Sequence, residues 1–157
     1  MLWAYVMPKS YTYPDFLRQA LDAKAGAALR WSHNDGFLQF RRSCYLKSNG
    51  SFTDIAVIDT QQNSAYLNAW HHYCAVFSQT QGWAGLYVDG YLRNSVTFDP
   101  NLYNFLWEAN ELWIMTTYYT KYGNVFLQGY AAEVKFFNRA LTQDEIRQEM
   151  FRRSPAR

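Results

Sequence analysis

The chain of 157 residues has little charge of either sign, only two cysteines and no long apolar run. Fifteen Lys and Arg residues stand against 13 Asp and Glu residues, and a formal net charge of +2 gives no strong field that would steer the protein onto nucleic acid. No apolar run approaches the roughly 18 residues that a membrane-spanning helix needs. The two cysteines form no CxxC motif, which argues against a cysteine-based zinc or redox site.

Glycine and proline are also scarce, with eight and four residues, whereas aromatic residues make up 19% of the chain. Hydrophobic residues account for 49%, so we expect a folded chain rather than a disordered one. Aromatic side chains favour half-buried strands. The length corresponds to one domain over residues 1–157, which at this size buries roughly 68–70% of its unfolded surface.

Short apolar blocks of about five to eight residues, separated by turn signals, predict β-strands along most of the chain. The turn signals at residues 34–36, 49–50 and 89–90 read Asn-Asp-Gly, Asn-Gly and Asp-Gly, residue types that tolerate the positive φ of tight hairpins. Residues 16–25, rich in Ala, Leu and Lys, could instead form a helix of two or three turns. The predicted strands cover residues 2–7, 29–32, 37–41, 45–47, 55–58, 70–78, 83–88, 91–96, 112–117 and 131–137.

A short helix is predicted near the C-terminal end of the sequence. Thr142 and Glu145 have the S/T-x-x-E spacing in which the Thr hydroxyl accepts from a helical amide and the Glu side chain accepts from the amide of the cap residue. Many strands followed by one short helix predict a two-sheet sandwich with a C-terminal helix. The apolar residues expected to face the sheets are Leu141, Ile146, Met150 and Phe151.

Several segments resemble one superfamily in their order and spacing. The sequence is similar to the concanavalin A-like lectin/glucanase superfamily, and specifically to its laminin G-like and pentraxin-like jelly-roll domains. The resemblance implies an all-β fold, a two-sheet antiparallel jelly-roll sandwich with one short C-terminal helix, in which most of these residues are architectural. The segments are WHHYCAVF (70–77), GLYVDG (85–90), GYAAEV (129–134), FNRALT (137–142) and EI (145–146), with a looser match over residues 2–8.

The resemblance also sets an expectation about the first strand. In that family at least one strand usually precedes the strand that begins here at Leu2, and it pairs with a strand near the C-terminus. We therefore expect residues 1–157 to be a single laminin G/pentraxin-like jelly-roll domain that lacks its first strand or is excised from a longer chain. A partner could supply the missing strand, because a bare sheet edge invites pairing.

Cys44 and Cys74 could form a disulfide or remain two buried thiols, and the residues leave both alternatives open. The resemblance to pentraxins places Cys74 in a signature whose cysteine is bridged, although the family's partner position holds no cysteine here. The pentraxin calcium loop corresponds to residues 116–123, which contain no carboxylate, so we expect no cofactor and no pentraxin-type calcium site. A calcium site that uses a lone Asp35 or Asp99 stays open.

Catalysis is not expected from these residues. The superfamily includes laminarinase-type glycosidases, which display paired carboxylates as Glu-x-Asp-x-x-Glu on one strand, and this motif is absent. His71 and His72 are neighbours in a predicted strand and therefore point to opposite faces. The Gly-x-Ser-x-Gly nucleophile motif is absent as well. We therefore predict that the protein is not an enzyme.

The aromatic surplus indicates a binding role. Sugars present flat apolar faces and hydroxyl edges, so exposed Tyr and Trp side chains are typical of lectin sites, and they are equally typical of protein interfaces. The candidate residues for contact with a glycan or protein ligand are Tyr118, Tyr119, Tyr122 and Trp83.

Two functions follow as hypotheses. The first is a non-catalytic binding or adhesion module, extracellular or at the cell surface, where the sequon at Asn49 could carry an N-linked glycan. The second is a structural subunit of a large intracellular assembly, in which the jelly roll serves as a packing and docking piece. Neither hypothesis involves nucleic acid or a membrane span.

Overall fold

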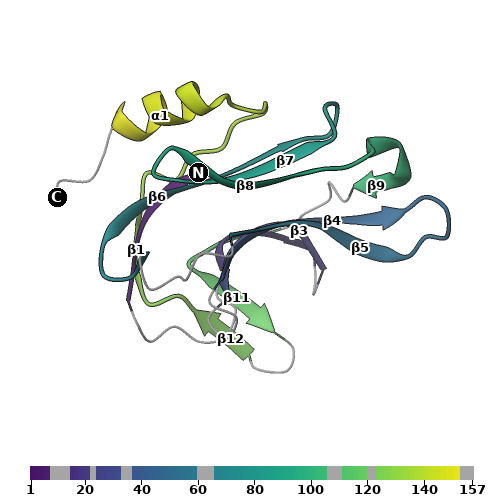
Figure 1. The fold of residues 1–157 in the computed structure, drawn as a ribbon. Coiled ribbons are helices and arrows are strands. Elements are labelled where there is room, and N and C mark those ends of the chain that lie inside the picture. The colour runs from purple at the N-terminus through teal and green to yellow at the C-terminus, as the bar shows by residue number, and fades with distance from the viewer. Residues whose placement is uncertain are drawn as a thin grey trace.

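The computed structural model describes residues 1–7, 15–21, 24–32, 37–59, 66–105, 111–119 and 123–152. It shows two antiparallel sheets that form a sandwich, with one helix after the last strand (Figure 1). The predicted all-β, two-sheet fold with a C-terminal helix is therefore confirmed. The predicted turn at residues 34–36 lies outside the described residues.

Sheet A has the strand order β13-β1-β6-β7-β8. β1 pairs with β6 on one side and with β13, the last of the described strands, on the other. The resemblance assigned this place beside the last strand to a strand ahead of Leu2, and β1 itself occupies it; a further preceding strand stays a prediction. The strands are β1 (Leu2–Val6), β6 (Trp70–Ser78), β7 (Trp83–Val88), β8 (Tyr91–Thr97) and β13 (Gly129–Ala132).

Sheet B has the strand order β10-β2-β3-β4-β5, and β9 pairs with β4 beside this path. A separate two-stranded sheet consists of β11 (Thr116–Tyr119) and β12 (Gly123–Phe126). A 3-10 turn at Pro100–Leu102 leads into β9. The strands of sheet B are β2 (Asp15–Leu21), β3 (Lys24–Ser32), β4 (Phe37–Leu46), β5 (Phe52–Asp59), β9 (Tyr103–Phe105) and β10 (Glu111–Ile114).

Residues 16–21 belong to β2 and residues 24–25 to β3, so the helical alternative for this segment is wrong. β2 pairs with β3 on one side and with β10 on the other, and these backbone hydrogen bonds override the helix propensity of its Ala and Leu residues. The inner face of β2 also contributes to the core, where the ring of Phe16 stacks on that of Tyr73 with a centroid distance of 4.6 Å.

Two predicted strands end earlier than the sequence pattern indicated. The strand predicted over residues 112–117 is divided at Met115, whose φ of 57° ends β10 and starts β11. The strand predicted over residues 131–137 stops at Ala132, because Glu133 has a φ of 51°. Positive φ is incompatible with an extended strand, and apolar patterning alone does not reveal it.

α1 (Gln143–Arg152) has the predicted cap. The amide of Glu145 donates to Thr142 Oγ1 at 3.3 Å, and the amide of Thr142 donates to Glu145 Oε2 at 2.8 Å. Leu141, Ile146 and Met150 are buried as expected. The prediction for Phe151 is wrong, because its side chain is 73% exposed. A helix turns by about 100° per residue, so the position after Met150 has left the buried stripe.

Candidate functional site

The outer face of sheet A is divided into two halves. Side chains alternate between the two faces along each strand, and one half of the outward-facing residues is covered by α1 and the residues before it. There Cys74, Tyr87, Leu141 and Ile146 form an apolar cluster separate from the core between the sheets. Figure 1 shows α1 on the side of sheet A that faces away from sheet B. We call this part the helix-covered half.

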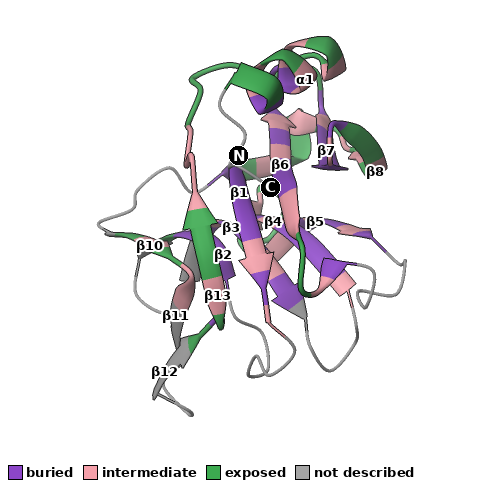
Figure 2. Ribbon diagram, turned by 90° about the vertical axis from the view of Figure 1, so that its left-hand side faces the viewer, coloured by how far each residue is buried: buried purple, intermediate pink, exposed green. Residues whose placement is uncertain are grey.

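Three aromatic side chains occupy the other half. Tyr130 of β13 pairs with Tyr5 of β1, which in turn pairs with Trp70 of β6. The ring centroid of Tyr5 lies 6.1 Å from that of Trp70 and 6.1 Å from that of Tyr130, and the Trp70 and Tyr130 centroids are 6.5 Å apart. Tyr130 is 59% exposed, and Tyr5 and Trp70 are half-buried. In Figure 2 the three strands run side by side below α1. We call Tyr5, Trp70 and Tyr130 the aromatic row.

The aromatic row offers a ligand a joined apolar surface. Its rings meet at edge-to-face or tilted angles, an arrangement that stabilises aromatic groups against one another. Such a surface suits the flat apolar face of a sugar ring, whose hydroxyl groups stay at the edge. Sequence analysis did not identify this set, because the three residues are far apart in the chain and meet only through strand pairing. The available signal was that each is an aromatic residue at an outward position of its strand.

His72 lies beside Trp3 at the boundary between the two halves. It is 2% exposed, and its ring centroid is 5.5 Å from that of Trp3. Burial, followed by the charge of the nearby amino terminus, lowers the pKa of His72 to about 4, so the imidazole is neutral at pH 7. Its neighbour His71 faces the inside, where its ring contacts Tyr66 and Tyr73. The expectation that the two histidines point to opposite faces is confirmed.

Asp89, in the turn between β7 and β8, holds both histidines in place. Its Oδ2 lies 2.7 Å from Nδ1 of His71, and its Oδ1 accepts from the amide of His72 at 2.9 Å. Burial raises the pKa of Asp89, but the two hydrogen bonds outweigh burial and leave that pKa lowered. Asp89 therefore ties the β7–β8 turn to the start of β6.

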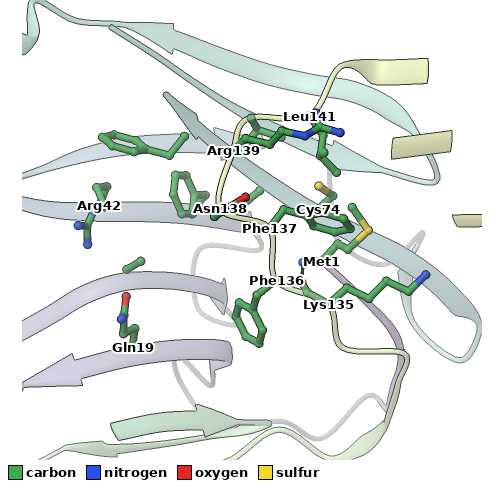
Figure 3. A pocket seen from close by; sticks show the side chains of 15 residues that line it. Met1, Gln19, Arg42, Cys74, Lys135, Phe136, Phe137, Asn138, Arg139 and Leu141 are labelled. Atoms are coloured by element: carbon green, nitrogen blue, oxygen red, sulfur yellow. Dashed lines mark hydrogen bonds between the residues drawn. The ribbon is translucent and has the colours of Figure 1, made fainter. Parts of the chain in front are cut away.

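A pocket of about 300 Å³ opens between the two sheets (Figure 3). Its wall on sheet B is a register row of Gln19, Ala27 and Arg42 from β2, β3 and β4. Its wall on sheet A is the later part of β6, with Ala75 and Phe77 on the inner face. The segment 135–139, which leads from β13 to α1, closes the remaining side. We call this space the inter-sheet pocket.

Arg42 is the most buried charged side chain of the inter-sheet pocket. It is 3% exposed, its Nη1 donates to the carbonyl oxygen of Gly26, and its guanidinium lies 5.7 Å from the ring centroid of Phe77. Burial lowers the pKa of Arg42 to about 10, so the group keeps its positive charge at pH 7. Two further cations, Lys135 and Arg139, line the pocket near its rim and pair with acidic residues of α1.

The four aromatic residues predicted to contact a ligand do not all fall in one place. Trp83 begins β7, and its half-buried indole lies over Gly85 and packs against the helix-covered cluster. Tyr118 and Tyr119 lie in β11, which pairs with β12 in a separate sheet. The described structure covers the backbone of these two tyrosines but not their side chains, and Tyr122 lies outside the described residues. Ligand contact by these residues stays a prediction.

Cys44 and Cys74 are both buried free thiols, so the disulfide alternative is not what the structure contains. Cys44 points into the core between the sheets, whereas Cys74 points to the outer face of sheet A, under α1. The two thiols therefore lie on opposite sides of sheet A. Burial raises the pKa of the Cys74 thiol to about 11, which keeps it protonated and unreactive.

The remaining predicted positions lie in turns. Asn49 is exposed, and its Oδ1 accepts from the amide of Ser51. Asp99 caps the 3-10 turn by accepting from the amide of Asn101 at 2.9 Å, and Asp35 lies outside the described residues. Within the described ranges, no group of three or more His, Cys, Asp and Glu residues could hold a metal ion. No helix among the described elements is long and apolar enough to cross a membrane.

Comparison with known families gives a match over most of the sequence. The family described as the concanavalin A-like lectin/glucanases superfamily (Laminin_G_3) matches residues 2–147. No curated protein matches the chain significantly in sequence.

Solved structures resemble the chain in fold at low sequence identity. One, from Bacteroides ovatus, is described as a "putative carbohydrate binding protein"; it is 17% identical with a TM-score of 0.65, and the match covers 94% of this chain and 38% of that one. The CBM40 module of the Ruminococcus gnavus IT-sialidase, bound to α2,6-sialyllactose, is 10% identical with a TM-score of 0.59 and coverage of 94% and 80%. The receptor-binding domain of botulinum neurotoxin D is 13% identical with a TM-score of 0.55 and coverage of 94% and 35%.

Proposed function

Because the chain belongs to the concanavalin A-like lectin/glucanase superfamily, we propose that it is a non-catalytic module that binds glycans through the aromatic row. The observation that carries this proposal is the cross-strand set of Tyr5, Trp70 and Tyr130 on the half of sheet A that α1 leaves bare. Three outward rings in one register row give a sugar a stacking surface that the flat strand backbone holds in place.

The matched structures support the class of ligand. The Ruminococcus gnavus module was solved with sialyllactose, and the Bacteroides ovatus protein is named for carbohydrate binding. The chain spans 38% of the Bacteroides ovatus protein and 35% of the neurotoxin domain, so it corresponds to one part of those chains. Sialyllactose and lactose are therefore suitable first probes, followed by a broad glycan array.

The test compares the wild-type protein with Trp70→Ala on the array and, for each glycan that binds, by calorimetric titration. We expect the variant to bind about two- to tenfold more weakly, since one aromatic contact contributes about 0.5–1.5 kcal/mol. Tyr91→Ala is the matched control, because Tyr91 is 61% exposed on the same sheet but lies at the far strand, under Arg147. Equal losses in both variants, or an array without any bound glycan, would contradict the proposal.

We also propose that the protein acts outside the cell or on its surface. Asn49 is exposed in the turn after β4, and an N-linked glycan needs an exposed acceptor of this kind. Mass spectrometry of the protein from its natural source would detect a glycan at this position. The alternative of a structural subunit stays a prediction, because neither the structure nor the matched proteins favour it.

A further inference from the structure

The inter-sheet pocket lies beside a part of β6 that has a neighbour on one side only. β1 pairs with β6 from Trp70 to Tyr73, whereas β7 pairs with β6 as far as Ser78. No described strand pairs with residues 74–78 on the side away from β7. In Figure 2, β6 extends beyond β1 toward α1. The backbone groups on this edge are therefore arranged to accept one more antiparallel strand in line with β1.

The pocket has space for the inward side chains of such a strand. Ala75 on sheet A and Ala27 on sheet B are small, lie on inner faces and yet keep partial solvent exposure. Large side chains at these two positions would fill the space between the sheets. A strand that continued the line of β1 would place alternate side chains in this space, next to Ala75 and Phe77.

The positive charge of the pocket indicates that one of those inward side chains is acidic. Arg42, Lys135 and Arg139 line it, and none of the described lining residues is Asp or Glu. Arg42 lies deepest, beside the ring of Phe77. A carboxylate next to a buried guanidinium forms a charge-assisted hydrogen bond, which is stronger than one between neutral groups.

We propose that the inter-sheet pocket accepts an extended peptide strand, which pairs with the free edge of β6 and directs an acidic side chain to Arg42. The occupant continues the antiparallel pairing that β1 begins, and its inward residues are acidic opposite Phe77 and apolar opposite Ala75. This site is separate from the aromatic row, because the peptide enters between the sheets and the row lies on the outer face of sheet A.

The probe is the acetylated, amidated tetrapeptide Thr-Glu-Val-Leu. The pairing of Leu2 with Tyr73 puts the residue that would precede Met1 opposite Ala75, so Leu lies opposite Ala75 and Glu lies opposite Phe77. Binding is measured by NMR, together with hydrogen exchange of the amides of residues 74–78. We expect the peptide to slow exchange of those amides. Replacing its Glu by Gln should weaken binding about tenfold or more, since a hydrogen bond to a charged group contributes about 1.5–3 kcal/mol. A second protein carries the same four residues fused directly ahead of Met1, in the same register, so that low affinity cannot hide the pairing.

Three variants of the protein test whether peptide binding depends on Arg42 and on the space beside Ala75. Arg42→Met should lose the preference for Glu over Gln, and Ala75→Leu should fill the pocket and weaken binding of both peptides. Arg41→Met is the matched control, because Arg41 points to the opposite face of β4 and pairs with Asp54 at 3.3 Å. It should leave binding unchanged. If one of the first two variants does not fold, the other decides.

The proposal is overturned if neither the free nor the fused peptide protects the amides of residues 74–78. It is also overturned if Arg41→Met and Arg42→Met have equal effects, which would indicate general charge attraction. Acetate binding in the pocket without any strand protection would identify a small-anion site instead. Protection by the fused strand with no detectable binding of the free peptide supports the proposal and indicates a weak acceptor.

Discussion

The two halves of the outer face of sheet A share β6 and both contain aromatic residues, yet one half is core and the other is surface. Tyr87 in the helix-covered half is 5% exposed, and Tyr130 in the aromatic row is 59% exposed. Both are tyrosines at outward positions of their strands. The difference is that α1 and Leu141 lie over Tyr87, whereas no described element covers Tyr130.

This comparison shows that strand alternation decides which face a side chain occupies, but not whether that face is buried. Burial of the outer face depends on where the chain goes after β13, and the cap formed by Thr142 and Glu145 fixes where α1 starts. The helix begins immediately after the segment 135–139 has crossed the sandwich edge. A local capping signal thus determines which outward residues become core and which remain free to bind a ligand.

The largest expected effect is the loss of stability on Tyr87→Ala. Tyr87 packs against Cys74 and Ile146 under the helix, and removal of a large buried aromatic side chain costs about 3–5 kcal/mol. Urea denaturation followed by tryptophan fluorescence measures the free energy of unfolding. Phe151→Ala is the control, because Phe151 is on the same helix but 73% exposed, and it should change stability by less than about 0.5 kcal/mol. A small loss for Tyr87→Ala would mean that α1 does not bury this half.

The next effect is a pH dependence located at the boundary between the halves. The pKa of His72 is about 4 in the folded protein, against 6.5 for an unperturbed histidine. As pH falls below 6.5 the unfolded chain takes up the proton first, so the stability present above pH 6.5 is lost progressively down to pH 4. Between pH 7 and pH 5 we expect the free energy of unfolding to fall by about 2 kcal/mol from this group.

The variant His72→Gln isolates this contribution. It removes the titrating group while leaving His71, Asp89 and the other ionisable residues in place, so its stability should depend less on pH over the same range. Measuring above pH 5 also avoids most of the protonation of carboxylates with a lowered pKa, such as those of Asp89 and Glu145. Equal slopes of the free energy of unfolding against pH for the variant and the wild type would mean that groups other than His72 cause the pH dependence.

Much of the fold could be predicted from the sequence, because its signals are local. The turns at residues 49–50 and 89–90 and the cap at Thr142 each act within a few residues. The segment 16–25 could not be decided in this way, because its helix propensity competes with hydrogen bonds from strands elsewhere in the chain. The break at Met115 depends on a single positive φ that hydrophobic patterning does not reveal.

The candidate site was less predictable than the fold, because it depends on pairing between strands that are far apart in the sequence. Trp70 and Trp83 each begin a strand, and both point outward from sheet A. Only the pairing partners differ: Trp70 meets Tyr5 in the bare half, whereas Trp83 lies over Gly85 beside the helix-covered cluster. Residues that are neighbours only across strands cannot be grouped without the register, so the aromatic row was missed while Trp83 was selected.

The smallest expected effect is the loss of stability on Tyr130→Ala, because Tyr130 is the exposed counterpart of Tyr87. Tyr130→Ala should change the free energy of unfolding by less than about 0.5 kcal/mol, as is usual for exposed positions. β13 keeps its backbone pairing with β1 in this variant, and the lost ring contacts with Tyr5 and Trp70 are largely exposed to water. The measurement is the same urea titration, run beside Tyr87→Ala.

A loss comparable to that of Tyr87→Ala would mean that the aromatic row stabilises the sheet, and its exposed rings would then need no ligand to explain them. A negligible loss leaves three aromatic side chains held on the surface without a large role in stability, which is the pattern of a binding site.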